Sequence, residues 1–184
     1  MAFLNYTDFV PVPAPVTTGT TIQSYTDPLG DVWVAKNGVN SGQWRRARDV
    51  LHCSYSRNAA FTNSATALTL VTLPYDTVRS DRYGLYVGGT FTCPVPGFYW
   101  ISAQVGFNAG GQNNINISKT GTATRTMAHG TSGLASQYQE DQCSSLELCV
   151  AGDTLIVQIA STVTSSAIRV GNETCLFVSY WGTG

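Results

Sequence analysis

The chain has 184 residues and a net charge of −1, and 11% of its residues are charged, against roughly 25% in an average domain. The length suits one domain with its own core, or a domain with a small appendage. Since there is no basic stripe and no long apolar run, we expect neither a nucleic-acid partner nor a membrane-spanning segment.

The first thirty or so residues (1–30) differ in composition from the rest of the chain. Pro11, Pro13 and Pro15 alternate with small apolar residues and favour an extended chain. The apolar residues before them are Phe3, Leu4, Tyr6, Phe9 and Val10. Disordered tails seldom carry so many aromatic residues, so we predict an arm that docks onto another protein. The alternative is a disordered terminus.

Residues 31–52 read as a small unit, with a strand over residues 32–36 and turn signals after it. The segments WVAKNGV, GQW and RARDVLH, which lie within residues 33–52, resemble a segment near the start of minor tail proteins of phages that infect actinobacteria. The resemblance implies a virion protein. In that setting Arg45, Arg46 and Arg48 could contact an acidic neighbouring subunit, and a solvated charged face is the alternative.

Strands and turns alternate from residue 57 to the end, and helix signals are nearly absent. Strands are predicted at residues 58–61, 67–73, 85–87, 90–93, 98–105, 115–120, within 122–133, and at 137–148, 155–160, 167–170 and 175–180. Many short strands at regular spacing favour a β-sandwich.

The strand over residues 98–105 follows a Pro96-Gly97 turn and is predicted to be central. Because side chains alternate along a strand, Tyr99 and Ile101 share one face, and Phe98 and Trp100 share the other. Both faces are largely apolar, which predicts that both are covered.

This stretch also carries a resemblance to a known family. Residues 91–101, FTCPVPGFYWI, resemble the signature of the complement C1q and tumour-necrosis-factor-like jelly rolls. Later landmarks follow in the family's order: INISKTG at 115–121, LELCVAGDTL at 146–155 and TCLFVSY at 174–180. The resemblance covers about residues 57–184 and implies an all-β jelly-roll β-sandwich.

The same resemblance implies a homotrimer, in which three sandwiches pack around a threefold axis and one sheet supplies an apolar seam. It makes Tyr99, Ile101, Phe177 and Tyr180 the candidate trimer-interface residues. The alternative for each of them is a place in the core of a single chain.

Motifs for chemistry are weak. The two histidines, His52 and His129, have no serine in a GxSxG turn to act with, and no metal-binding or phosphate-binding motif is present. We therefore predict no enzyme activity, no cofactor and no metal. The five cysteines are odd in number and most lie among apolar residues, so we interpret them as buried thiols in a protein folded in a reducing cytoplasm. The alternative is a disulfide between two of them.

Together these observations predict two parts: an arm and small β unit at residues 1–56 for virion attachment, and a jelly-roll domain at residues 57–184. The predicted function is a structural phage protein of the virion, a minor tail or fibre component assembled in the host cytoplasm. Its partners would be itself, other virion proteins and a host-surface glycan bound by loops 108–114 and 126–136. One alternative is a capsid decoration or head-fibre protein anchored by the arm. Another is a secreted tumour-necrosis-factor-like signalling module, although no secretory signal pattern is visible.

Overall fold

In the computed structural model, the described residues are 22–27, 30–36, 44–63, 69–108, 111–121, 125–132, 139–163 and 166–183. Within these ranges the chain is almost entirely β-structure, and its one helix is the short α1 (Ala47–Val50). The predicted all-β sandwich is therefore confirmed. The predicted docking residues of the arm lie outside the described residues: Phe3, Leu4, Tyr6, Phe9, Val10, Pro11, Pro13 and Pro15.

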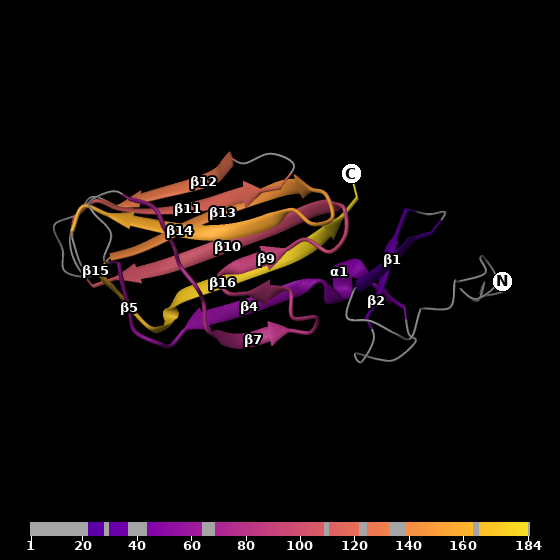
Figure 1. The fold of residues 1–184 in the computed structure, drawn as a ribbon, viewed down its shortest axis with the longest axis horizontal. Helices are drawn as coiled ribbons and strands as arrows, with labels where there is room; N and C mark the ends of the chain where they lie inside the picture. Colours follow the sequence, from indigo (N-terminus) through magenta and orange to yellow (C-terminus); the bar gives the residue numbers. More distant parts are fainter. Residues whose placement is uncertain are drawn as a thin grey trace, which may run out of the picture.

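Two large sheets form the body of the molecule, and their strands run along its long axis (Figure 1). Among the described residues, the first sheet contains β5 (Phe61–Asn63), β15 (Ser166–Ile168), β10 (Gly97–Phe107), β16 (Gly171–Gly182), β4 (His52–Arg57) and β7 (Thr77–Asp81), with β13 (Gln139–Cys149) on the other side of β10. The second contains β12 (Arg125–Ser132), β11 (Asn113–Thr120), β14 (Thr154–Ser161), β9 (Thr90–Thr92) and β8 (Tyr86–Val87), with β6 (Val71–Thr72) paired to β14.

The core lies between these two sheets. Along β10, buried and partly exposed side chains alternate, as expected for a strand that covers a core with one face. Tyr99 and Ile101 point into the core, where they meet the inward side chains of the second sheet, such as Ile115 and Leu155. The prediction of a central strand is confirmed by the pairing of β10 with both β13 and β16. The prediction that both of its faces are covered is wrong for the single chain, because Phe98 and Trp100 on the outward face are only partly buried.

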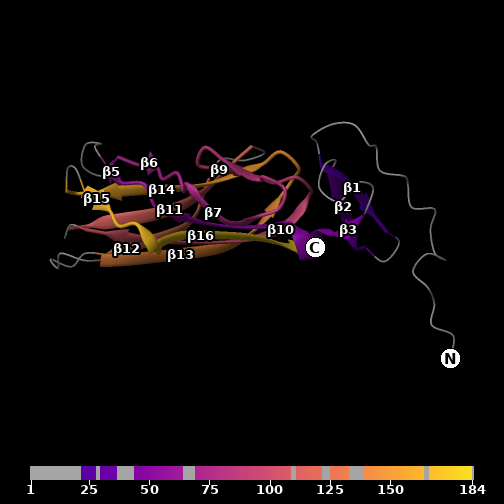
Figure 2. The same cartoon turned by 90° about the horizontal axis from the view of Figure 1, so that it is seen from below.

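A third, smaller sheet joins β1 (Ile22–Thr26), β2 (Val32–Lys36) and β3 (Arg45–Arg46) at one end of the sandwich (Figures 1 and 2). We call this sheet with α1 the N-terminal unit. It shares the core of the sandwich, because Val34 and Leu51 belong to the same buried cluster as Tyr180. The N–H of Tyr180 also donates a hydrogen bond to the carbonyl oxygen of Leu51, at 2.9 Å.

Two predicted boundaries change. The arm was expected to extend to residue 30, but β1 pairs with β2 along its whole length and Ile22 packs against the core. The domain boundary at residues 56/57 passes through β4, which pairs with β16 and β7 inside the large sheet. The first strand of the sandwich is therefore β4. Residues 58–60 were expected to begin the first strand, but they form a connection between β4 and β5.

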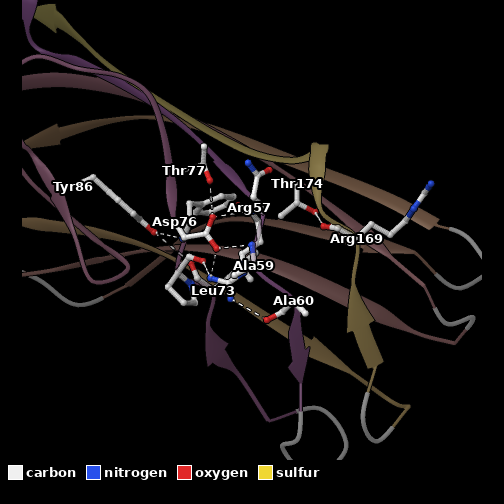
Figure 3. A network of polar contacts seen from close by, with 12 residues as sticks. Arg57, Ala59, Ala60, Leu73, Asp76, Thr77, Tyr86, Arg169 and Thr174 are labelled. Carbon is white, nitrogen blue, oxygen red and sulfur yellow. Dashed lines mark hydrogen bonds and ion pairs between the residues drawn. The ribbon is translucent and has the colours of Figure 1, made fainter.

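The end of β4 is fixed by an arginine network (Figure 3). The Arg57 side chain donates hydrogen bonds to the carbonyl oxygens of Pro74, at 2.5 Å, and Ala60, at 3.3 Å, and it pairs with the Asp76 carboxylate at 3.4 Å. That carboxylate accepts hydrogen bonds from the backbone N–H groups of Asn58 and Ala59, both at 2.8 Å. The network ties β4 to the segment before β7 and to the start of β5.

Two further observations concern the described residues. None of the helices in the described ranges is long and apolar enough to cross a membrane. The five cysteines are thiols, of which Cys53, Cys93, Cys143 and Cys149 are buried and Cys175 is half-buried. Burial raises the pKa of Cys143 to about 12, and it also raises the pKa of Cys175.

Candidate self-association surface

Three of the four predicted trimer-interface residues lie inside the core of a single chain. Tyr99, Ile101 and Tyr180 are at most 3% exposed. The Tyr99 ring packs edge-on against the ring of Tyr180, and its hydroxyl donates a hydrogen bond to the carbonyl oxygen of Val95 at 2.8 Å. A side chain without exposed surface in one chain has none left for a second copy to cover. The choice of these three as interface residues is therefore corrected to core residues.

The fourth, Phe177, is 42% exposed and lies on the opposite face of the same sheet. Residues that pair across an antiparallel ladder share a face, so the register shows which side chains surround it. Phe177 pairs with Ser102 on β10 and with Ser54 on β4. Two residues from Ser102 along β10, on the same face, Trp100 pairs with Leu146 of β13 and with Ser179 of β16.

We call this face the outer sheet surface and define it by its apolar side chains. These are Phe98, Trp100, Leu146, Leu148, Phe177 and Trp181. Four of them are largely exposed: Leu146 at 44%, Leu148 at 54%, Phe177 at 42% and Trp181 at 64%.

The outer sheet surface is held in a defined shape. The rings of Trp100 and Trp181 lie 6.2 Å apart, centroid to centroid, at an interplanar angle of 36°. The indole N–H of Trp181 donates a hydrogen bond to the Ser179 hydroxyl at 3.1 Å. Leu148 pairs directly with Phe98 across the ladder. The β-ladder therefore presents these side chains without any loop rearrangement.

The size of this apolar area can be estimated from the exposed fractions. With full side-chain areas of roughly 200 Å², the four most exposed residues leave on the order of 400 Å² of apolar surface in water. The largest apolar patch of a typical monomer is roughly 300–600 Å² and is often functional, so an area of this size fits a site of interaction. Between Leu148 and Gln142, the outward positions of β13 carry no charged side chain, which suits an interface centre.

Sequence reasoning missed Leu146, Leu148 and Trp181 as exposed apolar residues. The signal was present in β13, where Gln142, Ser144, Leu146 and Leu148 alternate with residues that face the core. Alternation along a strand shows which residues share a face. When both faces carry apolar residues, however, the sequence does not show which face is turned toward the core.

The predicted glycan-binding loops and the two histidines lie in several parts of the molecule. Residues 126–132 of the predicted loop 126–136 belong to the strand β12, which pairs with β11. In loop 108–114, residues 113 and 114 belong to β11. His129 stands opposite Asn116 in this ladder, and the half-buried His52 stands opposite Ser179 in the other sheet. Among the described residues no group of three or more His, Cys, Asp or Glu side chains is placed to hold a metal ion.

The sequence matches no family model and no curated protein. Solved structures give a clear answer about the fold. Murine APRIL at pH 5.0 superposes with a TM-score of 0.57 and 14% identity, covering 71% of this chain and 98% of that one. The fold is the tumour-necrosis-factor and complement 1q jelly roll.

Two other structures agree. The globular domain of the zebrafish complement 1qA protein has a TM-score of 0.54 and 17% identity, covering 70% of this chain and 94% of that one. The Eiger TNF of S. frugiperda has a TM-score of 0.55 and 12% identity, covering 72% and 93%. At these identities the likeness establishes the fold, and function has to be argued from the surfaces of this chain.

Proposed function

We propose that the chain is a non-enzymatic structural subunit that forms a homotrimer through the outer sheet surface and is built into a phage particle as a minor tail or fibre component. The observation that carries the self-association is the exposed apolar face of β13, β10 and β16, with Leu148 and Trp181 more than half exposed. Burial of roughly 400 Å² per subunit is worth about 10 kcal/mol at 25 cal/mol per Å², before the cost of association.

The virion role is supported by the N-terminal region. The segment that resembles minor tail proteins corresponds to β2, β3 and α1, which form a folded extension at one end of the sandwich (Figure 1). Asp27 fixes this unit, because its carboxylate accepts hydrogen bonds from the Trp33 indole N–H, at 3.0 Å, and the Asp31 backbone N–H, at 2.9 Å. The apolar and proline-rich arm precedes β1 and supplies the anchor.

The experiment uses a deletion of residues 1–21, which leaves β1 and its pairing with β2 intact. Light scattering should give a three-chain mass for both the full chain and the truncated chain. The truncated protein should keep its melting temperature and lose incorporation into the parent particle. Normal copy number of the truncated protein in particles would show that the arm is not the anchor, and a one-chain mass for the full chain would refute the trimer.

The second candidate is a capsid decoration or head-fibre protein, anchored by the same arm. Copy number per particle separates the two, because decoration requires hundreds of copies and a tail component requires few. A secreted signalling module remains the alternative of another class, and the absence of the protein from particles would favour it.

A further inference from the structure

A pocket of about 450 Å³ opens at the end of the sandwich where β5, β15 and the residues after β10 meet. This end lies opposite the N-terminal unit along the long axis in both views (Figures 1 and 2). The volume falls within the range of small-molecule sites, roughly 300–1,000 Å³. In a subunit anchored through its N-terminal region, this end points away from the attachment point.

The walls of the pocket combine apolar and neutral polar groups. Phe61 and Val170 supply apolar surface, and Val170 is 48% exposed. Thr62 and Asn108, both exposed, supply a hydroxyl and an amide, and Glu173 also lines the pocket. An amide both donates and accepts hydrogen bonds, a hydroxyl does the same, and a carboxylate accepts. This set matches a ligand that carries several hydroxyl groups and an apolar C–H face.

One wall is held rigidly through Arg169 (Figure 3). The backbone N–H of Arg169 donates to the carbonyl oxygen of Gly106 at 2.8 Å, and its carbonyl oxygen accepts from the Thr174 hydroxyl at 2.6 Å. Its guanidinium pairs with Glu173 at 2.6 Å. A Cβ at Gly106 would come within 3.0 Å of the Arg169 Cβ, so the glycine makes room for this side chain. A wall fixed in advance loses little entropy when a ligand binds.

The β5 side of the pocket is fixed by Arg57. Its guanidinium carbon lies 5.1 Å from the centre of the Phe61 ring and its side chain holds the carbonyl oxygen of Ala60. Asn108 is held as well, because its backbone N–H donates to the carbonyl oxygen of Ala167 at 3.0 Å. The Asn108 side chain therefore projects from a backbone that is fixed on the β15 side.

The charges around the pocket disfavour an anionic ligand. The Arg169 guanidinium contacts the carboxylates of both Glu173 and Glu140, the latter at 3.9 Å. The Arg57 guanidinium is paired with Asp76. The Arg169 guanidinium on the pocket wall is therefore already shared by two carboxylates, which a phosphate, sulfate or sialic acid would have to displace.

We propose that this pocket binds a neutral sugar ring, with Phe61 and Val170 against the C–H face and Asn108, Thr62 and Glu173 on the hydroxyls. The inference rests on the proposed function, since it assigns the host-surface glycan contact of the attached subunit to the end remote from the anchor. The pocket takes the place of loop 126–136 as the proposed glycan site, and it includes Asn108 from the predicted loop 108–114.

The test is saturation-transfer difference NMR on the purified full chain. The probes are the methyl glycosides of galactose, glucose, rhamnose and N-acetylglucosamine, with N-acetylneuraminic acid and glucose phosphate as anionic comparators. We expect at least one neutral glycoside to bind. Asn108→Ala should weaken its binding by at least about fivefold, the usual effect of one lost hydrogen bond. The matched control is Asn172→Ala, an exposed asparagine at the start of β16 that does not line the pocket and whose Oδ1 accepts a hydrogen bond from the Arg79 side chain.

Three results would overturn the inference: no signal from any neutral glycoside, tighter binding of an anionic comparator, or equal losses in Asn108→Ala and Asn172→Ala. Thr62→Val serves as a second pocket variant if Asn108→Ala lowers the melting temperature. Sugar binding is measured on the isolated protein, so it can hold when incorporation into particles fails, and incorporation can hold when sugar binding fails.

Discussion

A charge placed at Leu148 tests the outer sheet surface most directly. Leu148 is 54% exposed in the single chain, so Leu148→Glu should change the stability of one folded subunit by no more than about 0.5 kcal/mol. In a trimer that buries this surface, each subunit would lose roughly 100 Å² of apolar burial, about 2.5 kcal/mol. Three copies give about 7.5 kcal/mol, or about five powers of ten in the dissociation constant, before the cost of burying each carboxylate.

The control is Val87→Glu on β8, which places the same charge at a 73% exposed apolar residue of the other sheet. Light scattering at micromolar concentration should give a three-chain mass for the wild type and for Val87→Glu, and a one-chain mass for Leu148→Glu. Thermal melts should show folded subunits in all three. A Leu148→Glu protein that keeps the three-chain mass would show that the trimer, if present, uses another surface.

Two further predictions concern stability. Burial opposes ionisation of the Asp76 carboxyl, but hydrogen bonds from Asn58, Ala59 and Thr77 and the Arg57 charge leave its pKa lowered. A lowered folded-state pKa contributes stability above the unfolded value of about 4, and this contribution disappears as the pH falls further. Urea denaturation between about pH 6 and pH 3 should show this loss in the wild type and a smaller one in Asp76→Asn; equal losses would contradict the assignment. Tyr99→Asp should prevent folding of the single chain, whereas Tyr99→Phe should cost about 1 kcal/mol and keep the trimer; soluble monomeric Tyr99→Asp would return Tyr99 to the interface.

The sequence predicted the sandwich well because strand signals are local. Alternation along β10 and the turn signals at Pro96-Gly97 and Gly152-Asp153 depend on residues next to one another. The order of the family landmarks added the topology. Lys119 and Asp153, which belong to two of these landmarks, form a buried ion pair with Nζ and Oδ2 3.2 Å apart. Gly121 is part of the same arrangement, because a Cβ at this position would collide with the Asp153 side chain.

The interface residues were harder to predict, because the choice between two faces depends on the neighbouring sheet. Tyr99 and Trp100 are both large aromatic residues, and nothing in their own segment says which one meets the core. The decision comes from the second sheet, whose inward Phe91 packs edge-on against the Tyr99 ring at 5.7 Å between centroids. The pocket could not be predicted from the sequence either, because Phe61, Asn108 and Arg169 come together only through the pairing of β15 with β5 and β10.

The proposed trimer surface, the anchor and the sugar pocket belong to separate parts of the subunit, so all three can act at the same time. The strands that carry the outer sheet surface, β13, β10 and β16, run along the long axis of the sandwich, and the N-terminal unit lies at one end of it (Figure 1). The pocket lies at the end where β5 and β15 meet. A trimer formed along the side would hold three pockets at one end and three anchors at the other. Binding of several sugars on one cell surface then gains from effective concentration, so a weak single site can support firm attachment. Leu148→Glu should therefore weaken adhesion to cells far more than it weakens binding of a free glycoside, and equal effects on both would argue against the trimer as the adhesive unit.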